Sequence, residues 1–403
     1  MEFFDADNNY IGPGADASDE ALKRAERLYR EGLRRQQQAG ERVEYGRNDH
    51  HREFTNICTG RILYDAGLVP LENLSRSARD EIGGNVNLIA MMRDYISLAG
   101  NTPPPIDDKN AIITRALGSS DFPSLVNNIL NKSLIAGFDT APEVWPAFTK
   151  YAPVPDFKSI DFPRGASMPA PPEVIENGEV KPATLYDDGK ESDYIRSHVH
   201  RVSVSRQALM NSDTTALAAM PYQAGVAVSR AIGNGVFNLL IDNPALDDGE
   251  LLFSTAHGNF ITSGAAPSVT TLEAAYVAMG TQQNGAGEYL NYKPRFVISG
   301  PTYTGTLAVL RSGMNTGNDG ESDGTITTLV DSRLSGSAAW YAAADPMHGG
   351  ILIAVLAGTE GQPRFERIMN APSGAPDGLH YRCGFDFRVV CGNWKALFQN
   401  DGA

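Results

Sequence analysis

Apolar positions at helical spacing mark the clearest predicted helix, within residues 119–145. The apolar side chains that recur every three or four residues are Leu125, Val126, Ile129, Leu130, Leu134 and Ile135. Asp121 is a suitable N-cap, Pro123 fits the first turn, and Gly137 is a natural C-terminal stop. The pattern predicts a helix with one buried face at the start of a globular body.

The chain before this helix is predicted to form helices with little apolar surface. Residues 18–38 form a charged pattern with a narrow apolar stripe, and further helical patterns cover about 49–66 and 75–99. The sequence GNTPPPIDD at 100–108 breaks the pattern and is the best candidate for a domain boundary. We therefore predict an N-terminal helical arm or scaffold-like segment over 1–117 and the start of the body at 118–150.

Residues 151–193 are rich in proline, glycine and charge, which excludes a helix and a central strand. Residues 194–209 then alternate as a strand, so we predict an extended two-stranded ribbon over 151–205 with its turn near Asn177. A ribbon that leaves its own core is expected to contact a neighbouring subunit. The charged candidates for that contact are Glu173, Glu176, Glu179, Lys181, Lys190, Glu191 and Arg206.

The remainder of the chain predicts a mixture of helices and strands. A long helix is capped by Ser212 or Asp213, restarts at Pro221 and ends at Asn243 and Pro244. Its glycines permit close approach of another backbone, namely Gly225, Gly233 and Gly235. Beyond it we predict helices at 270–283 and 301–312, strands at 295–300, 327–331 and 351–357, and one or two strands at the end. The predicted fold class is α+β.

Composition and charge argue against several classes of function. The formal net charge of −14 argues against nucleic-acid binding, which a basic patch would support. The three cysteines, Cys58, Cys383 and Cys391, have no metal-ligand spacing and indicate free or buried thiols in a reducing compartment. The acidic N-terminus lacks the features of a signal peptide, and the aliphatic run at 351–357 is too short to span a bilayer. We expect a soluble protein made in a cytoplasm.

No catalytic motif emerges from the sequence, which lacks GxSxG, HExxH, a Walker A loop, GxGxxG and paired CxxC. His198 and His200 lie two apart on a predicted strand and could share a metal, but no third ligand is near in sequence. His50 and His51 are expected on a solvated surface. We predict a protein that is not an enzyme and needs no cofactor.

An acidic stretch at 319–324 imitates the first half of a calcium-binding loop through Asp319, Glu321 and Asp323. The pattern then fails, because Val330 stands where a bidentate glutamate is required. A solvated acidic loop is the favoured interpretation, with calcium binding as the open alternative.

Several long stretches together resemble one family. They are SSDFPSLVNNILNKSLIAGFDTAPEVWPAF, VPDFKSI, EVIENGEVKPATLYDDGKESDYIRSHVHRVSVSRQALMNSD, NLLIDNPALDDGELLFSTAHGNF and FDFRVVCGNWKALFQN. In this order, over residues 119–400, they resemble the capsid part of Mu-like phage and prophage major head subunits, which are often fused behind a prohead protease. Residues 1–117 carry no recognisable protease motif and depart from that fusion.

The resemblance implies a Hong Kong 97-type capsid fold. It places the extended loop at 151–205, the peripheral domain with its spine helix at 206–243, the axial domain at 244–363, and strands returning to the peripheral domain at 364–403. It implies a major capsid protein of a tailed bacteriophage whose copies form the hexamers and pentamers of an icosahedral shell around double-stranded DNA. The implied partners are other copies of the chain, a portal, and decoration or cement proteins. Neither a membrane nor sequence-specific DNA binding is implied.

The implied location is the virion, after assembly in the cytoplasm of a bacterial host. Two alternatives stay open at this point. An encapsulin-like nanocompartment shell would share the fold but enclose an enzyme cargo, and a hydrolase of unfamiliar type would need a concave polar site.

Overall fold

The structure is a computed structural model in which two compact units are distinguished, residues 1–58 and 59–403. It describes residues 3–4, 10–11, 47–67, 69–70, 72, 79, 88–98, 101–118, 121–171, 173, 182–205, 207, 211, 214–314, 326–359, 361–368 and 378–402. In the first unit, β1 (Phe3–Phe4) pairs antiparallel with β2 (Tyr10–Ile11). The helix predicted at 18–38 lies outside the described residues.

Helices α2, α4 and α5 precede the body helix. α2 (Arg47–Asp65) confirms the pattern at 49–66, and α4 (Leu88–Leu98) confirms the later part of the one at 75–99. α5 (Lys109–Gly118) follows the proline-rich joint, was not predicted, and packs on α4. The apolar residues of α4 and α5 are buried within the single chain, namely Leu88, Ile89, Met92, Tyr95, Ile96, Ile112, Ile113 and Ala116.

The predicted body helix is α6 (Asp121–Asp139), and it packs along α8 (Thr214–Asp242). α6 continues two residues beyond Gly137, so the prediction of a stop at that glycine is wrong. α8 runs through Pro221 without a restart and ends before Asn243, which has a φ of 45°. By length and composition the stretch Ala218–Asp242 could cross a membrane, but α8 packs on α6 and on strand β15, as a core helix does.

The long-strand sheet has the order β14-β15-β13-β3, and β8 also pairs with β15. Its strands are β3 (Thr149–Val154), β8 (Arg196–Ser205), β13 (Ile351–Leu356), β14 (Arg364–Arg367) and β15 (Gly378–Cys391). β3 and β13 are parallel, while β15 is antiparallel to β13, β14 and β8. Pro153 lies in β3 at an edge of this sheet, where a residue without an N–H is tolerated.

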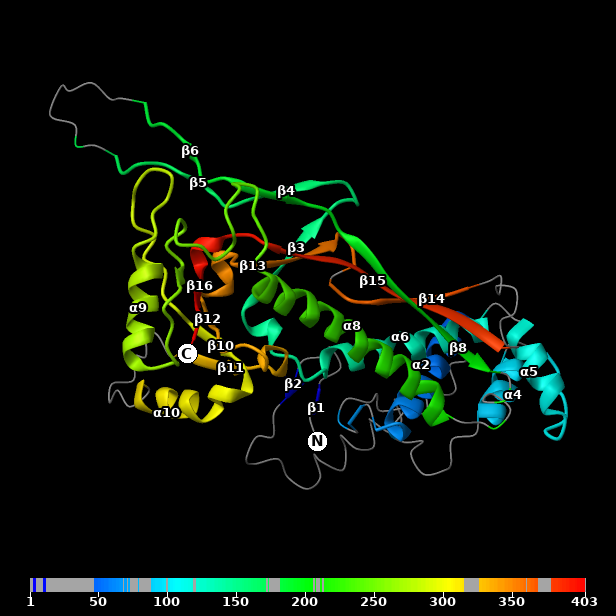
Figure 1. The fold of residues 1–403 in the computed structure, drawn as a ribbon. Coiled ribbons are helices and arrows are strands. Elements are labelled where there is room, and N and C mark those ends of the chain that lie inside the picture. Colours follow the sequence, from blue (N-terminus) through cyan, green and yellow to red (C-terminus); the bar gives the residue numbers. More distant parts are fainter. Residues whose placement is uncertain are drawn as a thin grey trace. The chain divides into compact units, whose positions relative to one another are not determined.

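Alternation along β15 places its odd-numbered side chains on one face, and this face contacts α8 through Phe387 and Val389 and α6 through Phe385. These side chains are all buried: Leu379, Tyr381, Cys383, Phe385, Phe387, Val389 and Cys391. The distance between β15 and α8 is short at Gly235, where a Cβ would meet the side chains of Val389 and Phe387. Figure 1 shows α8 running beside β15.

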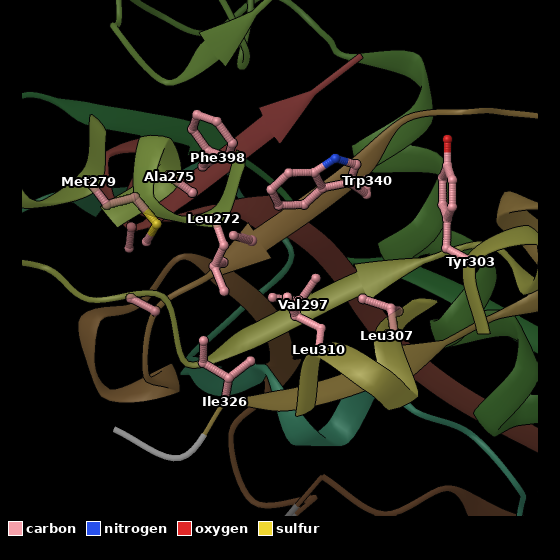
Figure 2. Packing of buried hydrophobic residues seen from close by; sticks show 13 residues of the cluster. Leu272, Ala275, Met279, Val297, Tyr303, Leu307, Leu310, Ile326, Trp340 and Phe398 are labelled. Carbon is pink, nitrogen blue, oxygen red and sulfur yellow. The ribbon is translucent and has the colours of Figure 1, made fainter. Parts of the chain in front are cut away.

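The short-strand sheet has the order β11-β10-β12-β16-β9. Its strands are β9 (Phe260–Ile261), β10 (Phe296–Ser299), β11 (Thr327–Val330), β12 (Trp340–Ala343) and β16 (Leu397–Asn400). Helices α9 (Val269–Gly280) and α10 (Thr304–Met314) contribute to its core, with Leu272 and Met279 from α9 and Leu307 and Leu310 from α10 (Figure 2). Trp340 and Phe398 complete this core from neighbouring strands.

The two sheets do not divide at residue 363. β13 pairs with β15 in the long-strand sheet, although residues 351–356 fall in the predicted axial segment 244–363. β16 pairs with β12 and β9 in the short-strand sheet, although it belongs to the predicted returning segment 364–403. The C-terminal segment 364–403 therefore contributes β14 and β15 to the long-strand sheet and β16 to the short-strand sheet. The mixed helices and sheets make the fold α+β.

The ribbon consists of two successive antiparallel strand pairs. β4 (Ile160–Pro163) pairs with β7 (Lys190–Asp193), and β5 (Ala166–Ser167) pairs with β6 (Tyr186–Asp187). Figure 1 shows β5 and β6 beyond β4 along the ribbon. The structure confirms paired arms within 160–167 and 186–193. The prediction of a ribbon over 151–205 is too long, because β3 and β8 at its two ends pair with β13 and β15 of the long-strand sheet. The predicted turn at 176–178 lies outside the described residues.

Candidate functional site

A corner between the two strand pairs sets the direction of the ribbon. The Arg164 N–H donates to the Gly189 carbonyl (2.9 Å) and the Asp188 N–H donates to the Gly165 carbonyl (3.2 Å). Gly165 and Gly189 have φ values of 138° and 85°, which residues with a Cβ rarely adopt. The two facing glycines therefore permit the change of direction between β4–β7 and β5–β6. The sequence of the corner, PRGAS against DDGKE, specifies this geometry locally.

The base of the ribbon rests on apolar side chains of the long-strand sheet. Phe162 of β4 and Ile195, just after β7, join Val154, Ala354 and Val390 in one buried cluster. Because Val390 is an even-numbered residue of β15, this cluster lies on the face of the sheet opposite to α8. The base of the ribbon is thus part of the folded body.

The Arg164 guanidinium is the centre of a buried polar cluster at this base. Its side chain is only 6% exposed, and it pairs with Glu191 of β7 and with Asp248 at 3.3 Å. The guanidinium also lies 5.9 Å from the ring centroid of Trp394. On that ring stacks His257, with 3.9 Å between the centroids and an interplanar angle of 14°. Charge pairing and an aromatic surface together hold the ribbon base to the body.

The two carboxylates around Arg164 experience different environments. Burial raises the pKa of Glu191, and the N–H of Asp247 (3.0 Å) and the Arg164 charge only partly oppose that rise. Burial also disfavours the charge of Asp248, but its contacts outweigh burial and lower its pKa: the Glu250 N–H, Arg164 and His257. The His257 Nε2 lies 3.2 Å from the Asp248 carboxylate. Asp248 therefore carries the more stable negative charge of this cluster.

A second attachment joins the ribbon to the loop after α9. Asp188 accepts the N–H of Gly285, and Lys395 lies 3.7 Å from the same carboxylate. Farther along the ribbon, the Ala170 N–H donates to Glu288 Oε1 (2.6 Å). A Cβ at Gly285 would crowd Asp188 and Tyr186, which explains the small residue at this point of the loop.

Two of the seven predicted contact residues have partners within the chain. The exposed Lys190 pairs with Asp161 at 2.6 Å, and the hydrogen bond between them raises the pKa of Lys190 and lowers that of Asp161. Glu191 is buried against Arg164, as described above, so it is not a surface charge in the single chain. Glu173 is exposed. The other four lie outside the described residues, namely Glu176, Glu179, Lys181 and Arg206. Their role between subunits stays a prediction.

No sequence pattern indicated the roles of Arg164, Asp248, His257 and Trp394. These residues are far apart along the chain and have no motif spacing. Three of them, Asp248, His257 and Trp394, lie in the stretches NLLIDNPALDDGELLFSTAHGNF and FDFRVVCGNWKALFQN that carry the resemblance. That location was the available signal, and it specified no contact.

The other candidate sites gain no support from the described parts of the chain. His198 stacks on Phe387 with 4.4 Å between ring centroids, and burial lowers its pKa. No group of three or more His, Cys, Asp or Glu side chains that could hold a metal ion is found among the described residues. The side chains of His50 and His51, and the acidic stretch 319–324, lie outside them. Cys58, Cys383 and Cys391 are all buried, as predicted.

The chain is similar to several solved shell proteins at low sequence identity. It is 11% identical to a virus-like particle protein from Pyrococcus furiosus, with 67% of this chain and 97% of that chain covered and a TM-score of 0.42. For a protein of Mycobacterium phage Bobi the identity is 16%, the coverage 64% and 89%, and the TM-score 0.42. For the SrpI encapsulin complex of Synechococcus elongatus the identity is 9% and the TM-score 0.40, with 65% of this chain and 91% of that chain covered.

Such remote similarities assign no function. No curated protein sequence matches the chain. The family model described as "Phage capsid protein" matches residues 195–400. That range begins just after the ribbon, includes Asp248, His257 and Trp394, and ends with the last strand of the short-strand sheet. Because it spans slightly more than half of the 403 residues, the chain belongs to the phage capsid protein family.

Proposed function

We propose that the chain is the major capsid protein of a tailed bacteriophage, with a Hong Kong 97-type fold and of the Mu-like major head subunit kind. Its copies assemble into hexamers and pentamers, and these tile an icosahedral head around packaged double-stranded DNA. The match of the phage capsid family over residues 195–400 carries this proposal.

Two further observations support a structural role over an enzymatic one. The buried polar residues at the ribbon base pair with one another, as Arg164 does with Glu191 and Asp248, and they anchor a ribbon. The net charge of −14 suits a shell that encloses DNA without binding it tightly, since like charges weaken that contact. We infer that the protein is not an enzyme and works in the virion after assembly in the host cytoplasm.

The same proposal assigns roles to the parts of the chain. The ribbon crosses to a neighbouring subunit, α8 is the spine of the peripheral domain, and the short-strand sheet lies in the axial domain. Residues 1–117 act in assembly, as an arm or a scaffold-like segment. A portal and decoration proteins are the expected partners besides other copies of the chain.

Electron microscopy of the purified full-length protein tests this proposal. The expected result is closed, phage-sized shells built from the chain alone or together with its assembly partners. Small shells filled with an enzyme cargo would instead identify a nanocompartment protein. A protein that stays monomeric under all assembly conditions would contradict a shell function of either kind.

A further inference from the structure

Two described stretches of the ribbon carry no charge, although residues 172–181 between them include Glu173, Glu176, Glu179 and Lys181. Residues 165–171 (GASMPAP) and 182–186 (PATLY) have no acidic or basic side chain, in a chain where charged residues make up 20%. These two stretches contain β5 and, on the opposite arm, Tyr186 of β6. In the sequence they lie between the attachment of the ribbon to the body and the charged residues 172–181.

Large apolar side chains are exposed on this neutral part. Met168 is 54% exposed and Leu185 is 63% exposed. Ser167 lies opposite Tyr186 and faces Asp188 and Gly285, so that face of the ribbon is turned toward its own subunit. Met168 and Leu185 are the next residues outward along each arm, and continued alternation of an extended chain puts them on the other face. Both are exposed in the single chain.

Charges of the inner ribbon are already paired within the chain. Lys190 pairs with Asp161, Glu191 with Arg164, and Asp188 with Lys395. Consequently these groups stabilise the ribbon base on its own body. Between this base and the exposed Glu173, the described ribbon offers exposed apolar surface at Met168 and Leu185. This surface is bounded on one arm by Asp187, whose carboxylate accepts the Gly189 N–H at 3.0 Å.

We propose that Met168 and Leu185 are apolar anchors that bind a second copy of this chain, so that the contact between ribbon and neighbour is apolar rather than ionic. This inference rests on the proposed self-assembly. Two copies with a net charge of −14 each repel one another, so contact is favoured where charge is absent. A two-stranded ribbon is also marginally stable in water and gains order when its apolar face is covered.

The chemistry of the contact predicts how assembly responds to salt. An ionic contact weakens as salt screens it, whereas salts that strengthen apolar association maintain or tighten an apolar one. The proposal therefore differs from a contact held by Lys190, Glu191 and their charged neighbours. In that case, added salt would dissociate the particles.

The test compares Leu185→Ser and Met168→Ser with Leu185→Met and Met168→Leu in the full-length protein. We expect the serine variants to reduce the particle fraction at least about tenfold, and the apolar variants to assemble like the wild type, because the former alone remove buried apolar area. Thermal unfolding of the unassembled subunits should be unchanged by all four, since these side chains are exposed in the single chain. Wild-type particles should persist on raising the NaCl concentration.

Normal assembly of both serine variants, or dissociation of wild-type particles by NaCl, would overturn the apolar contact and leave the proposed function standing. A wild-type chain that forms no particles would overturn the proposed function and this inference with it.

Discussion

Gly137 of α6 and Gly225 of α8 lie where the two helices pack, and each glycine makes room for the backbone of the opposite helix. A Cβ at Gly137 would overlap the carbonyl of Tyr222, and one at Gly225 would overlap the carbonyl of Leu134. Backbone cannot move aside as the end of a long side chain can. This close contact fixes the position of α6 on the helix that carries the core of the long-strand sheet.

Substitution of either glycine by alanine should therefore destabilise the subunit. Alanine favours a helix by about 1 kcal/mol over glycine, but overpacking costs about 1–3 kcal/mol or more. We expect Gly137→Ala and Gly225→Ala each to lower the free energy of unfolding, measured by urea denaturation of the unassembled protein.

Gly305 in α10 provides the matched control, because a Cβ there would meet no atom within 4 Å. Gly305→Ala should be neutral or stabilising by up to about 1 kcal/mol. If all three substitutions had the same effect, helix propensity rather than the crossing would govern these positions.

The packing of α6 on α8 also shows where sequence patterns predict the fold and where they fail. The periodicity of apolar positions locates α6 and α8, because each helix buries one face. The same reasoning interprets Gly137 as a helix end and Pro221 as a restart, since both residues break helices locally. In the structure both lie inside helices, because packing between α6 and α8 outweighs the local preference of a single residue.

The buried cluster at the ribbon base was beyond prediction for a different reason. Arg164, Asp248, His257 and Trp394 come together only after β4, the turn after α8 and the last segment have packed. As single residues in the sequence they resemble ordinary surface charges and aromatics. The presence of the ribbon was predictable, since proline excludes other structures over this stretch. The alternation at 194–209 marks a strand correctly, but that strand is β8 of the long-strand sheet and not the return arm of the ribbon.

The Arg333–Glu143 ion pair should contribute strongly to stability. Arg333, in the short helical turn Ser332–Leu334, donates from both terminal nitrogens to Glu143, each at 2.9 Å, and the Glu143 side chain is only 6% exposed. Its Nε donates to Asn234 of α8 at 2.7 Å. Arg333→Met leaves this carboxylate buried without its partner, so we expect a loss of about 3–5 kcal/mol in the free energy of unfolding.

Arg295→Met is the comparison for that measurement. Arg295 pairs with Asp345 on the surface, with 57% of the arginine side chain exposed, and such a pair contributes about 0–1 kcal/mol. Equal losses for the two variants in urea denaturation would refute a special contribution of the Glu143 pair.

Glu191 should give the subunit a distinctive dependence on pH. Burial raises its pKa in the folded state above the ordinary value of 4.5, so ionisation of this group opposes folding. That cost is fully present above the raised pKa and disappears as the pH falls from there to about 4.5. The Glu191→Gln variant cannot ionise at this position, so its free energy of unfolding lacks this cost.

We therefore expect the stability difference, wild type minus Glu191→Gln, to increase as the pH is lowered from 7 toward the ordinary pKa of 4.5. Urea denaturation of both proteins at several pH values measures it. A difference that stays constant, or decreases, over this range would mean that the Arg164 charge and the Asp247 N–H outweigh the burial of Glu191.

The last prediction separates the part of the N-terminal segment that belongs to the folded body from the part that acts in assembly. α4 and α5 bury Leu88, Met92 and Ile112, and α5 contacts α6, so removal of residues 1–118 should expose core surface and cost several kcal/mol of stability. Removal of residues 1–46 leaves the compact unit 59–403 complete. We expect this shorter truncation to unfold like the full-length protein in urea.

If residues 1–46 act in assembly, the protein that begins at Arg47 should fold normally and yet form fewer shells, or shells of the wrong size, in electron micrographs. Co-assembly with the full-length chain serves as the control, because subunits that fold correctly should enter mixed shells. Normal shells from the truncated protein alone would show that these residues are dispensable for assembly. A loss of stability on removing them would instead make them part of the folded body, as α4 and α5 are.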